Sequence, residues 1–196
     1  RIASAIDQGT KWLDLANEVN DQELLVTGHM VASIAYLCSG QLTKAREHGD
    51  QMLRLYQEDQ RDRIARTTNH EPKTVQSVFA SHWTWMLGFP DQAVQIGDDK
   101  DAYARRYGHP FSLGHALIVG AEIFDWRREP AAYRERADEA LRLAEENNLP
   151  WFSTVMVPTM YAVAKIREGN YLEGAKELKR LLPIRERDEG AMSQIL

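Results

Sequence analysis

SGQLTKA at residues 39–45 and LGFPDQA at residues 87–93 share one sequence pattern. In each, an apolar run ends at a glycine, and a small residue follows five positions later. The pattern recurs twice more. The four pairs of a turn residue and the small residue that follows it are Gly40 with Ala45, Gly88 with Ala93, Arg127 with Ala132, and Gly169 with Gly174. Glycine ends a helix cheaply in the left-handed conformation, and a small side chain lets two helices approach closely. The repeated pattern therefore predicts helical hairpins.

Apolar residues at spacings of three, four and seven predict helices over most of the chain. A first helix is expected at residues 2–19. Four pairs of an inner and an outer helix follow, at 23–38 with 43–58, 73–87 with 91–107, 112–126 with 130–147, and 151–167 with 171–182. Residues 59–73 interrupt this rhythm and are expected to form one long irregular connection. Pro183 is expected to stop or kink the last helix.

The turns recur roughly every 40 to 50 residues, a period typical of helical repeats that must stack to bury their apolar faces. A small residue also stands seven positions before each turn, at Ser33, Ser81, Gly120 and Ala162. These features predict an all-α fold, an α-α superhelix of about four antiparallel hairpins that resembles a tetratricopeptide solenoid. We expect one domain over residues 1–196. Because the chain opens at Arg1 within a predicted helix, we also expect a fragment of a longer protein.

The composition argues against several classes of function. The 196 residues carry a net charge of −5, which argues against general nucleic-acid binding because no basic stripe is present to neutralise phosphates. The most apolar stretch, residues 151–166, is too short to cross a bilayer and contains Pro158. The single cysteine, Cys38, cannot form an internal disulfide and indicates a reducing compartment. We therefore expect a cytoplasmic protein without a membrane partner, and a buried Cys38 thiol.

No motif predicts catalysis. A phosphate-binding GxxxxGK loop and an HExxH zinc motif are both missing from the sequence. His109 is interpreted as a residue of a helix-start turn before Pro110. The acidic cluster at residues 98–101 is interrupted by Lys100 and is interpreted as a solvated outer helix face. The chain is thus expected not to be an enzyme and to bind no metal or cofactor.

Three stretches carry a family resemblance: WMLGFPDQAV at 85–94, GHPFSLGHAL at 108–117 and RREPAAYRERADEALRLAEENNLPWF at 127–152. They resemble the C-terminal tetratricopeptide-like region of large bacterial signalling ATPases, over roughly residues 28–182. In that family a class III adenylate or guanylate cyclase domain, or a LuxR-type DNA-binding domain, is joined to an ATPase module and then to the helical array. One departure is the sequence Asn69, His70, Glu71 before Pro72, where the family has a glycine and an aspartate.

The resemblance implies a non-catalytic sensor module of a cytoplasmic signal-transduction ATPase with a cyclase output. Such a module would bind a protein, a peptide or a small-molecule effector, and would contact other domains of its parent chain, which carry any cyclase or ATPase activity. The alternative is a structural or oligomerisation scaffold of a LuxR-type transcriptional regulator. A homodimer is compatible with both.

In a tetratricopeptide register the inner helices line a concave groove. The predicted groove residues are His82, Trp85, Met86, Phe124, Asp125, Met156, Thr159 and Arg167. The groove would be mainly apolar, with His82, Asp125 and Arg167 as polar contacts. The same apolar stripe is also compatible with a packed core, in which these side chains turn inward.

Overall fold

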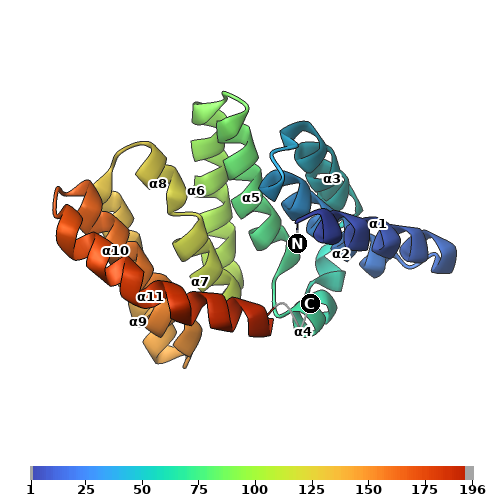
Figure 1. Ribbon diagram of the computed structural model, residues 1–196. Helices are drawn as coiled ribbons and strands as arrows, with labels where there is room; N and C mark the ends of the chain where they lie inside the picture. The colour runs from blue at the N-terminus through green and yellow to red at the C-terminus, as the bar shows by residue number, and fades with distance from the viewer. Residues whose placement is uncertain (1, 193–196) are drawn as a thin grey trace. The chain divides into compact units, whose positions relative to one another are not determined.

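The computed structural model describes residues 2–192, with side chains over residues 6–185, and this part of the chain is helical without strands. The all-α prediction is confirmed. The chain divides into two compact units, residues 1–107 and 108–196, whose helices are labelled in Figure 1. A single domain over the whole chain stays a prediction.

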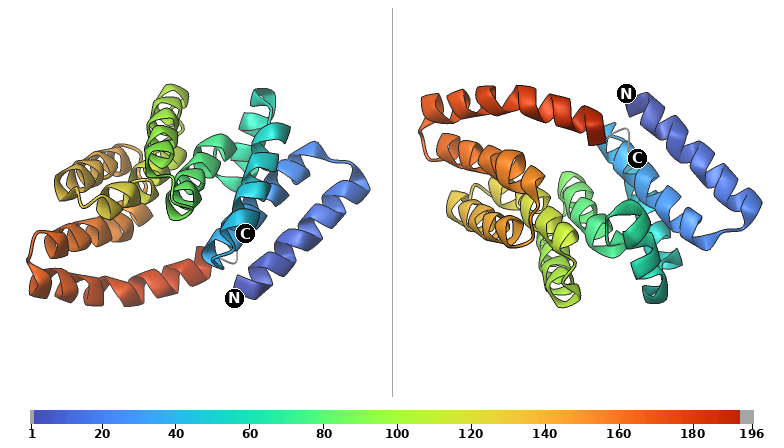
Figure 2. Two further views of the ribbon diagram at one scale, coloured as in Figure 1. Left: turned by 90° about the horizontal axis from the view of Figure 1, so that it is seen from above. Right: turned by 90° about the horizontal axis from the view of Figure 1, so that it is seen from below.

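The first unit is built on antiparallel hairpins, as the neighbouring helices α1 and α2 show in Figure 2. Its elements are α1 (Ile2–Val19), α2 (Gln22–Cys38), α3 (Leu42–Leu55), the short 3-10 helix η1 (Glu58–Gln60), α4 (Arg61–Thr68), α5 (Pro72–Met86) and α6 (Pro90–Tyr107). Helices α1 and α3 pack on α2, whereas α2, α3 and α6 all pack on α5. The buried centre contains Val26, Met30, Met52, Ile64 and Val75.

The second unit pairs α9 with α7 and α10, and α10 with α11. Its elements are α7 (Pro110–Val119), α8 (Glu122–Trp126), α9 (Pro130–Glu146), a π-helical turn (Phe152–Met156), α10 (Val157–Arg167) and α11 (Tyr171–Met192). Its core includes Leu117, Tyr133, Phe152, Val157 and Met160. His109 caps α7 by accepting a hydrogen bond from the Ser112 amide, which confirms its predicted place in a helix-start turn.

One turn geometry recurs at the predicted hairpins. After Gly40, for example, the Gln41 amide donates to the Tyr36 carbonyl at 2.9 Å, and the Gly40 amide donates to Leu37. This is the Schellman arrangement, which places its central residue in the left-handed region. The central residues are Gly40 at φ 76°, Gly88 at 92°, Arg128 at 60° and Gly169 at 93°.

The third turn therefore differs from the prediction by one residue. Arg127 has φ −76°, and the left-handed position is taken by Arg128. Counting five residues onward then reaches Tyr133, which is buried, rather than the half-buried Ala132. The alignment by small residues failed here because this hairpin uses an arginine and a tyrosine where the others use glycine and alanine or glycine.

The expected irregular connection at 59–73 is largely helical. Glu58 and Asp59 occupy the first turn of η1, where carboxylates favour a helix N-terminus, and α4 follows at once. Ile64 and Ala65 of α4 are buried in the first unit, and Asn69 ends the helix at φ 55°. The dense charges of this segment concealed its short apolar face.

Three further boundaries differ from prediction. The expected helix at 112–126 is divided into α7 and α8 near Gly120, and the expected helix at 151–167 begins with the π-helical turn. Pro158 follows that turn and has no backbone N–H to continue the regular ladder. Pro183, in contrast, lies inside α11, which continues to Met192.

No helix among the described residues is both long and apolar enough to cross a membrane. Cys38 is exposed at the end of α2, so the expectation of a buried thiol is wrong.

Candidate functional site

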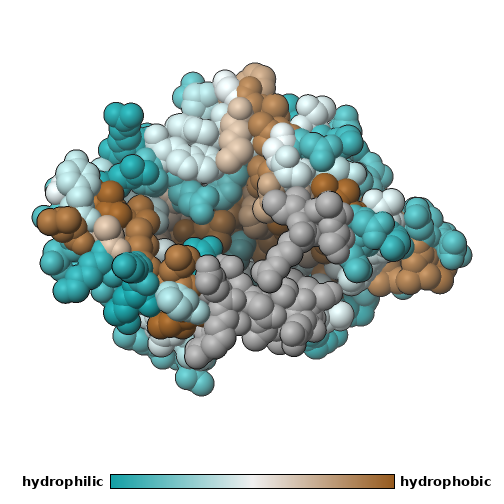
Figure 3. Space-filling view, in the orientation of Figure 1, coloured by the Kyte–Doolittle hydropathy of each residue, from teal (hydrophilic) through white to brown (hydrophobic). Residues whose placement is uncertain are grey.

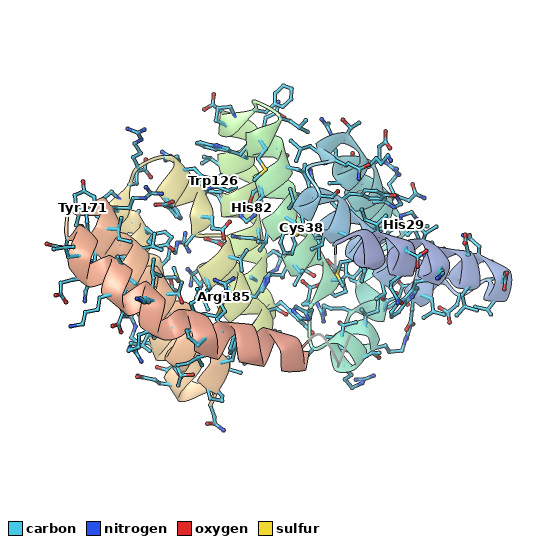
Figure 4. The ribbon with its side chains drawn as sticks, viewed as in Figure 1. His29, Cys38, His82, Trp126, Tyr171 and Arg185 are labelled. Carbon is cyan, nitrogen blue, oxygen red and sulfur yellow. The ribbon has the colours of Figure 1, made fainter. Side chains whose placement is uncertain are left out.

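The predicted groove residues of the first unit lie on α5. Figure 4 labels His82 among them. His82 is buried at 3% exposure, Trp85 is partly buried, and Met86 is 50% exposed. His82 therefore belongs to the interior and not to an open surface. Exposed apolar residues gather instead at the end of the α5–α6 hairpin, where Met86 is joined by Phe89 (Figure 3).

In the second unit, two predicted polar contacts are brought together. Arg167 of α10 donates from Nε and Nη2 to the two carboxylate oxygens of Asp125 on α8, at 2.5 and 2.7 Å. Asp125 raises the pKa of the Arg167 guanidinium by these bonds. The charged groups of Arg167 and Asp125 are therefore paired with each other and not directed at a ligand.

The other predicted residues of the second unit are engaged in its packing. Phe124 and Met156 pack against the buried core, and the Thr159 hydroxyl donates to the Val155 carbonyl at 2.7 Å. A continuous groove over both sets of residues stays a prediction.

A cleft that sequence reasoning missed lies wholly within the first unit. Helices α3 and α6 both pack on α5, and the cleft lined by these three helices has a volume of about 310 Å³. That volume lies at the lower end of the range of small-molecule sites. The lining is Arg46, Asp50 and Leu53 of α3, Lys73, Ser77, Ala80, Trp83 and Thr84 of α5, and Gln92, Ile96, Asp99, Lys100 and Tyr103 of α6.

The lining residues follow helical spacing on all three elements. On α3 they recur at i, i+4 and i+7, which places them on one helix face. The lining faces of α5 and α6 have the same spacings, for example from Lys73 to Ser77 and Ala80. Trp83 is 2% exposed and Ala80 is 8% exposed, so the inner wall is apolar.

The charged groups of the cleft differ in their partners. Lys100 is 4% exposed, and its Nζ lies 3.0 Å from Oδ1 of Asp101. Arg46 and Asp50 pair at 3.7 Å on α3. The Lys73 ammonium lies 4.5 Å from the centroid of the Tyr103 ring, in a cation–π contact. The interpretation of residues 98–101 as a solvated face is thus wrong for Lys100, which is buried.

A buried carboxylate supports one end of this site. Glu71 has no exposed surface and caps α5 by accepting from the Lys73 and Thr74 amides at 3.1 and 2.6 Å. Tyr103 donates a hydrogen bond to Oε1 of Glu71 at 3.3 Å. Burial raises the pKa of the Tyr103 hydroxyl, and it therefore stays a donor. Tyr103 is held in place at its hydroxyl while its ring contacts Lys73.

A histidine pair lies elsewhere in the first unit, where His29 of α2, labelled in Figure 4, meets His48 of α3. The Nδ1 atoms of His29 and His48 are 3.0 Å apart, so one ring donates and the other accepts. Burial, followed by the charges of His48 and Arg54, lowers the pKa of His29 to about 4. Burial also lowers the pKa of His48. Both rings are therefore neutral near pH 7.

No family model matches this chain, and no curated protein matches it. The resemblance of three stretches to signalling ATPases therefore stays a prediction. Among the residues that the structure describes, no group of three or more His, Cys, Asp or Glu side chains could hold a metal ion.

The cleft could have been suspected from its spacing. Arg46, Asp50 and Leu53 recur at the period of one helix face, as do Gln92, Ile96 and Asp99. What hid the site is its polarity, since charged residues on an outer helix are usually solvated. These charged faces enclose a cleft only because α3 and α6 pack on the same inner helix, α5. The sequence pattern alone does not specify that packing.

Proposed function

We propose that this chain is a non-catalytic binding module, a helical repeat array of the tetratricopeptide type, whose ligand occupies the α3–α5–α6 cleft. The single observation that carries the proposal is the cleft itself, an apolar wall of Ala80 and Trp83 with charged groups around it. Ligand sites commonly combine such a wall with a few polar groups that orient the ligand.

The parent protein is part of the same proposal. The three stretches that resemble bacterial signalling ATPases support a cytoplasmic sensor whose ligand state passes to a cyclase output. The ligand class proposed for the cleft is a small-molecule effector. The alternative ligand is a protein or peptide. It would bind along the predicted concave groove and contact Trp85 and Met86 instead of the cleft.

The test is a thermal-unfolding screen of a metabolite library against wild type and two phenylalanine variants. Ser77→Phe places an aromatic ring in the cleft, whereas Ala102→Phe places the same ring on the exposed side of α6. A ligand at 100 times its Kd should stabilise wild type and Ala102→Phe by about 2.7 kcal/mol, and Ser77→Phe far less. Stabilisation of all three proteins alike, or of none, would contradict the cleft as the ligand site.

A scaffold function is favoured by one other observation. Tyr171 and Leu172 at the start of α11 are 67% and 87% exposed, which suits a contact with another chain or domain (Figure 4). If these residues form an oligomer contact, Leu172→Ser should reduce the mass measured by analytical ultracentrifugation. A wild-type monomer at all concentrations would argue against self-association through this surface.

A further inference from the structure

We infer that the ligand of the cleft is a small organic monoanion with an apolar body, and that Lys73 binds its acidic group. The inference rests on the proposed function, because it specifies the chemistry of the same site. It follows from the arrangement of charge along the cleft.

Lys73 is the cation of the cleft that has no carboxylate partner among the described residues. Its ammonium lies on the Tyr103 ring, and its backbone amide is bound to Glu71. An ammonium has three donors, and a ring face satisfies them poorly. Lys73 is partly buried, so an acidic group delivered into the cleft would meet it at reduced dielectric.

The remaining cations of the cleft are compensated within the protein. Lys100 pairs with Asp101 and Arg46 pairs with Asp50. The Asp99 carboxylate accepts a hydrogen bond from Gln95 at 3.1 Å and is exposed to solvent, which screens its repulsion of an anion. The buried Glu71 carboxylate at the same end already accepts hydrogen bonds from Tyr56, Tyr103 and Thr74. The Lys73 ammonium is thus the cation that faces the cleft without a paired carboxylate among the described residues, which favours a ligand with one acidic group.

Apolar side chains supply the second half of the site. Leu53, Ala80, Trp83 and Ile96 line the same space, and Leu53 is 37% exposed. Covering such surface with an apolar ligand body is favourable, because it removes apolar area from water. A ligand that is charged throughout would leave this apolar wall uncovered, and a neutral apolar ligand would leave the Lys73 ammonium without an anionic partner.

Two fluorescent dyes of matched shape test the inference on the full chain. Anilinonaphthalene sulfonate carries one acidic group on an apolar body, and phenylnaphthylamine is the same body without the sulfonate. Wild type should bind the sulfonate about tenfold more tightly, because only the sulfonate can accept a charge-assisted hydrogen bond from the Lys73 ammonium. Lys73→Met should remove that preference and leave the affinity for the neutral dye unchanged.

Lys44→Met is the matched control variant. The Lys44 ammonium also lies over a tyrosine ring, 5.2 Å from the centroid of Tyr36, but it does not line the cleft. Lys44→Met should therefore keep the full preference for the sulfonate. Circular dichroism of each variant confirms that it is folded.

The outcomes separate the two proposals. If both dyes bind wild type equally, or if Lys73→Met and Lys44→Met lower the sulfonate affinity alike, the inference about the acidic group is overturned while the cleft stands. If Ser77→Phe leaves the binding of both dyes unchanged, or if neither dye binds wild type, the proposed site itself fails. Loss of both dyes in Ser77→Phe, with loss of the sulfonate preference in Lys73→Met alone, supports both.

Discussion

The Tyr56 hydroxyl donates to a carboxylate that has no contact with solvent: its oxygen lies 2.8 Å from Oε1 of Glu71. Tyr56 stands at the end of α3, whereas Glu71 caps the start of α5. The Thr74 hydroxyl also donates to Glu71, at 2.5 Å. The bond therefore joins two helices through a buried charge, which is tolerable only because several donors surround it.

Tyr56→Phe should lower the free energy of unfolding by about 1–3 kcal/mol, since it leaves a buried carboxylate with one donor fewer. Tyr103→Phe should cost less, because its hydroxyl lies farther away, at 3.3 Å. Urea denaturation of each variant measures the difference. Tyr36→Phe is the control, since the Tyr36 ring stacks on His48 at 5.2 Å and this contact does not involve the hydroxyl. Equal losses for Tyr56 and Tyr36 would show that Glu71 does not depend on its tyrosine donor.

Gly174→Ala should destabilise the second unit. A Cβ at residue 174 would lie 2.6 Å from the Ala162 carbonyl oxygen and 2.5 Å from Cγ1 of Ile166, so α10 and α11 would have to separate. Overpacking of this kind typically costs about 1–3 kcal/mol.

Gly97→Ala is the matched comparison for that change. It lies inside α6, and a Cβ there would meet nothing within 4 Å. Alanine should therefore stabilise by about 0.5–1 kcal/mol, because glycine weakens a helix interior. Thermal unfolding of both variants checks the pair, and shifts of the same sign would contradict the close approach at Gly174.

Arg128→Gly should stabilise the third hairpin turn by about 1 kcal/mol. Arg128 occupies at φ 60° the position that glycine takes in the turns at residues 40, 88 and 169. The left-handed conformation costs a residue with a Cβ about 1–2 kcal/mol. Arg127→Gly should instead destabilise, because Arg127 is in the right-handed region at φ −76° and pairs with Glu129 at 2.8 Å. Chemical denaturation in urea distinguishes the two, and a stabilising Arg127→Gly would place the turn at the wrong residue.

The His29–His48 pair should make the first unit less stable in mild acid. The pKa of His29 is about 4 in the folded protein and near 6.5 in an unfolded chain. The unfolded state therefore binds more protons below pH 6.5. The contribution of His29 to the free energy of unfolding is fully present above that pH and is lost as the pH drops toward about 4.

Between pH 7 and pH 5 we expect a loss of about 1 kcal/mol, because solvent screens a half-buried group. His29→Gln should flatten this dependence, since glutamine does not titrate. Urea denaturation at several pH values gives the slopes. A variant in which both histidines are glutamine, with the wild-type slope retained, would show that the pH dependence arises elsewhere.

The sequence predicted those helices whose ends carry strong signals. Helix α1 matches its expected range, and α5 begins at Pro72, where proline suits a first turn. Helix α4 was not predictable in this way, because Ile64 and Ala65 form a very short apolar face among charges. Arg128 was missed because its left-handed conformation follows from the hairpin geometry and not from its residue type.

The candidate site was less predictable than the fold. A buried Lys100 contradicts the usual exposure of lysine, and pairing with the Asp101 carboxylate offsets part of the cost of burying its charge. His82 was predicted either to face a groove or to turn inward, and it is buried because α2, α3 and α6 cover α5 on several sides. A one-dimensional pattern reports that a helix has an apolar face, but it does not report how many neighbours cover that helix.

The shared support of α3 and α6 has a dynamic consequence. Because each outer helix rests on α5, either one can open by local unfolding while the other remains seated. A molecule held between Leu53 of α3 and Ile96 of α6 would contact both, and each opening would then require its release. Amide hydrogen exchange in the two helices, independent in the empty protein, would slow together.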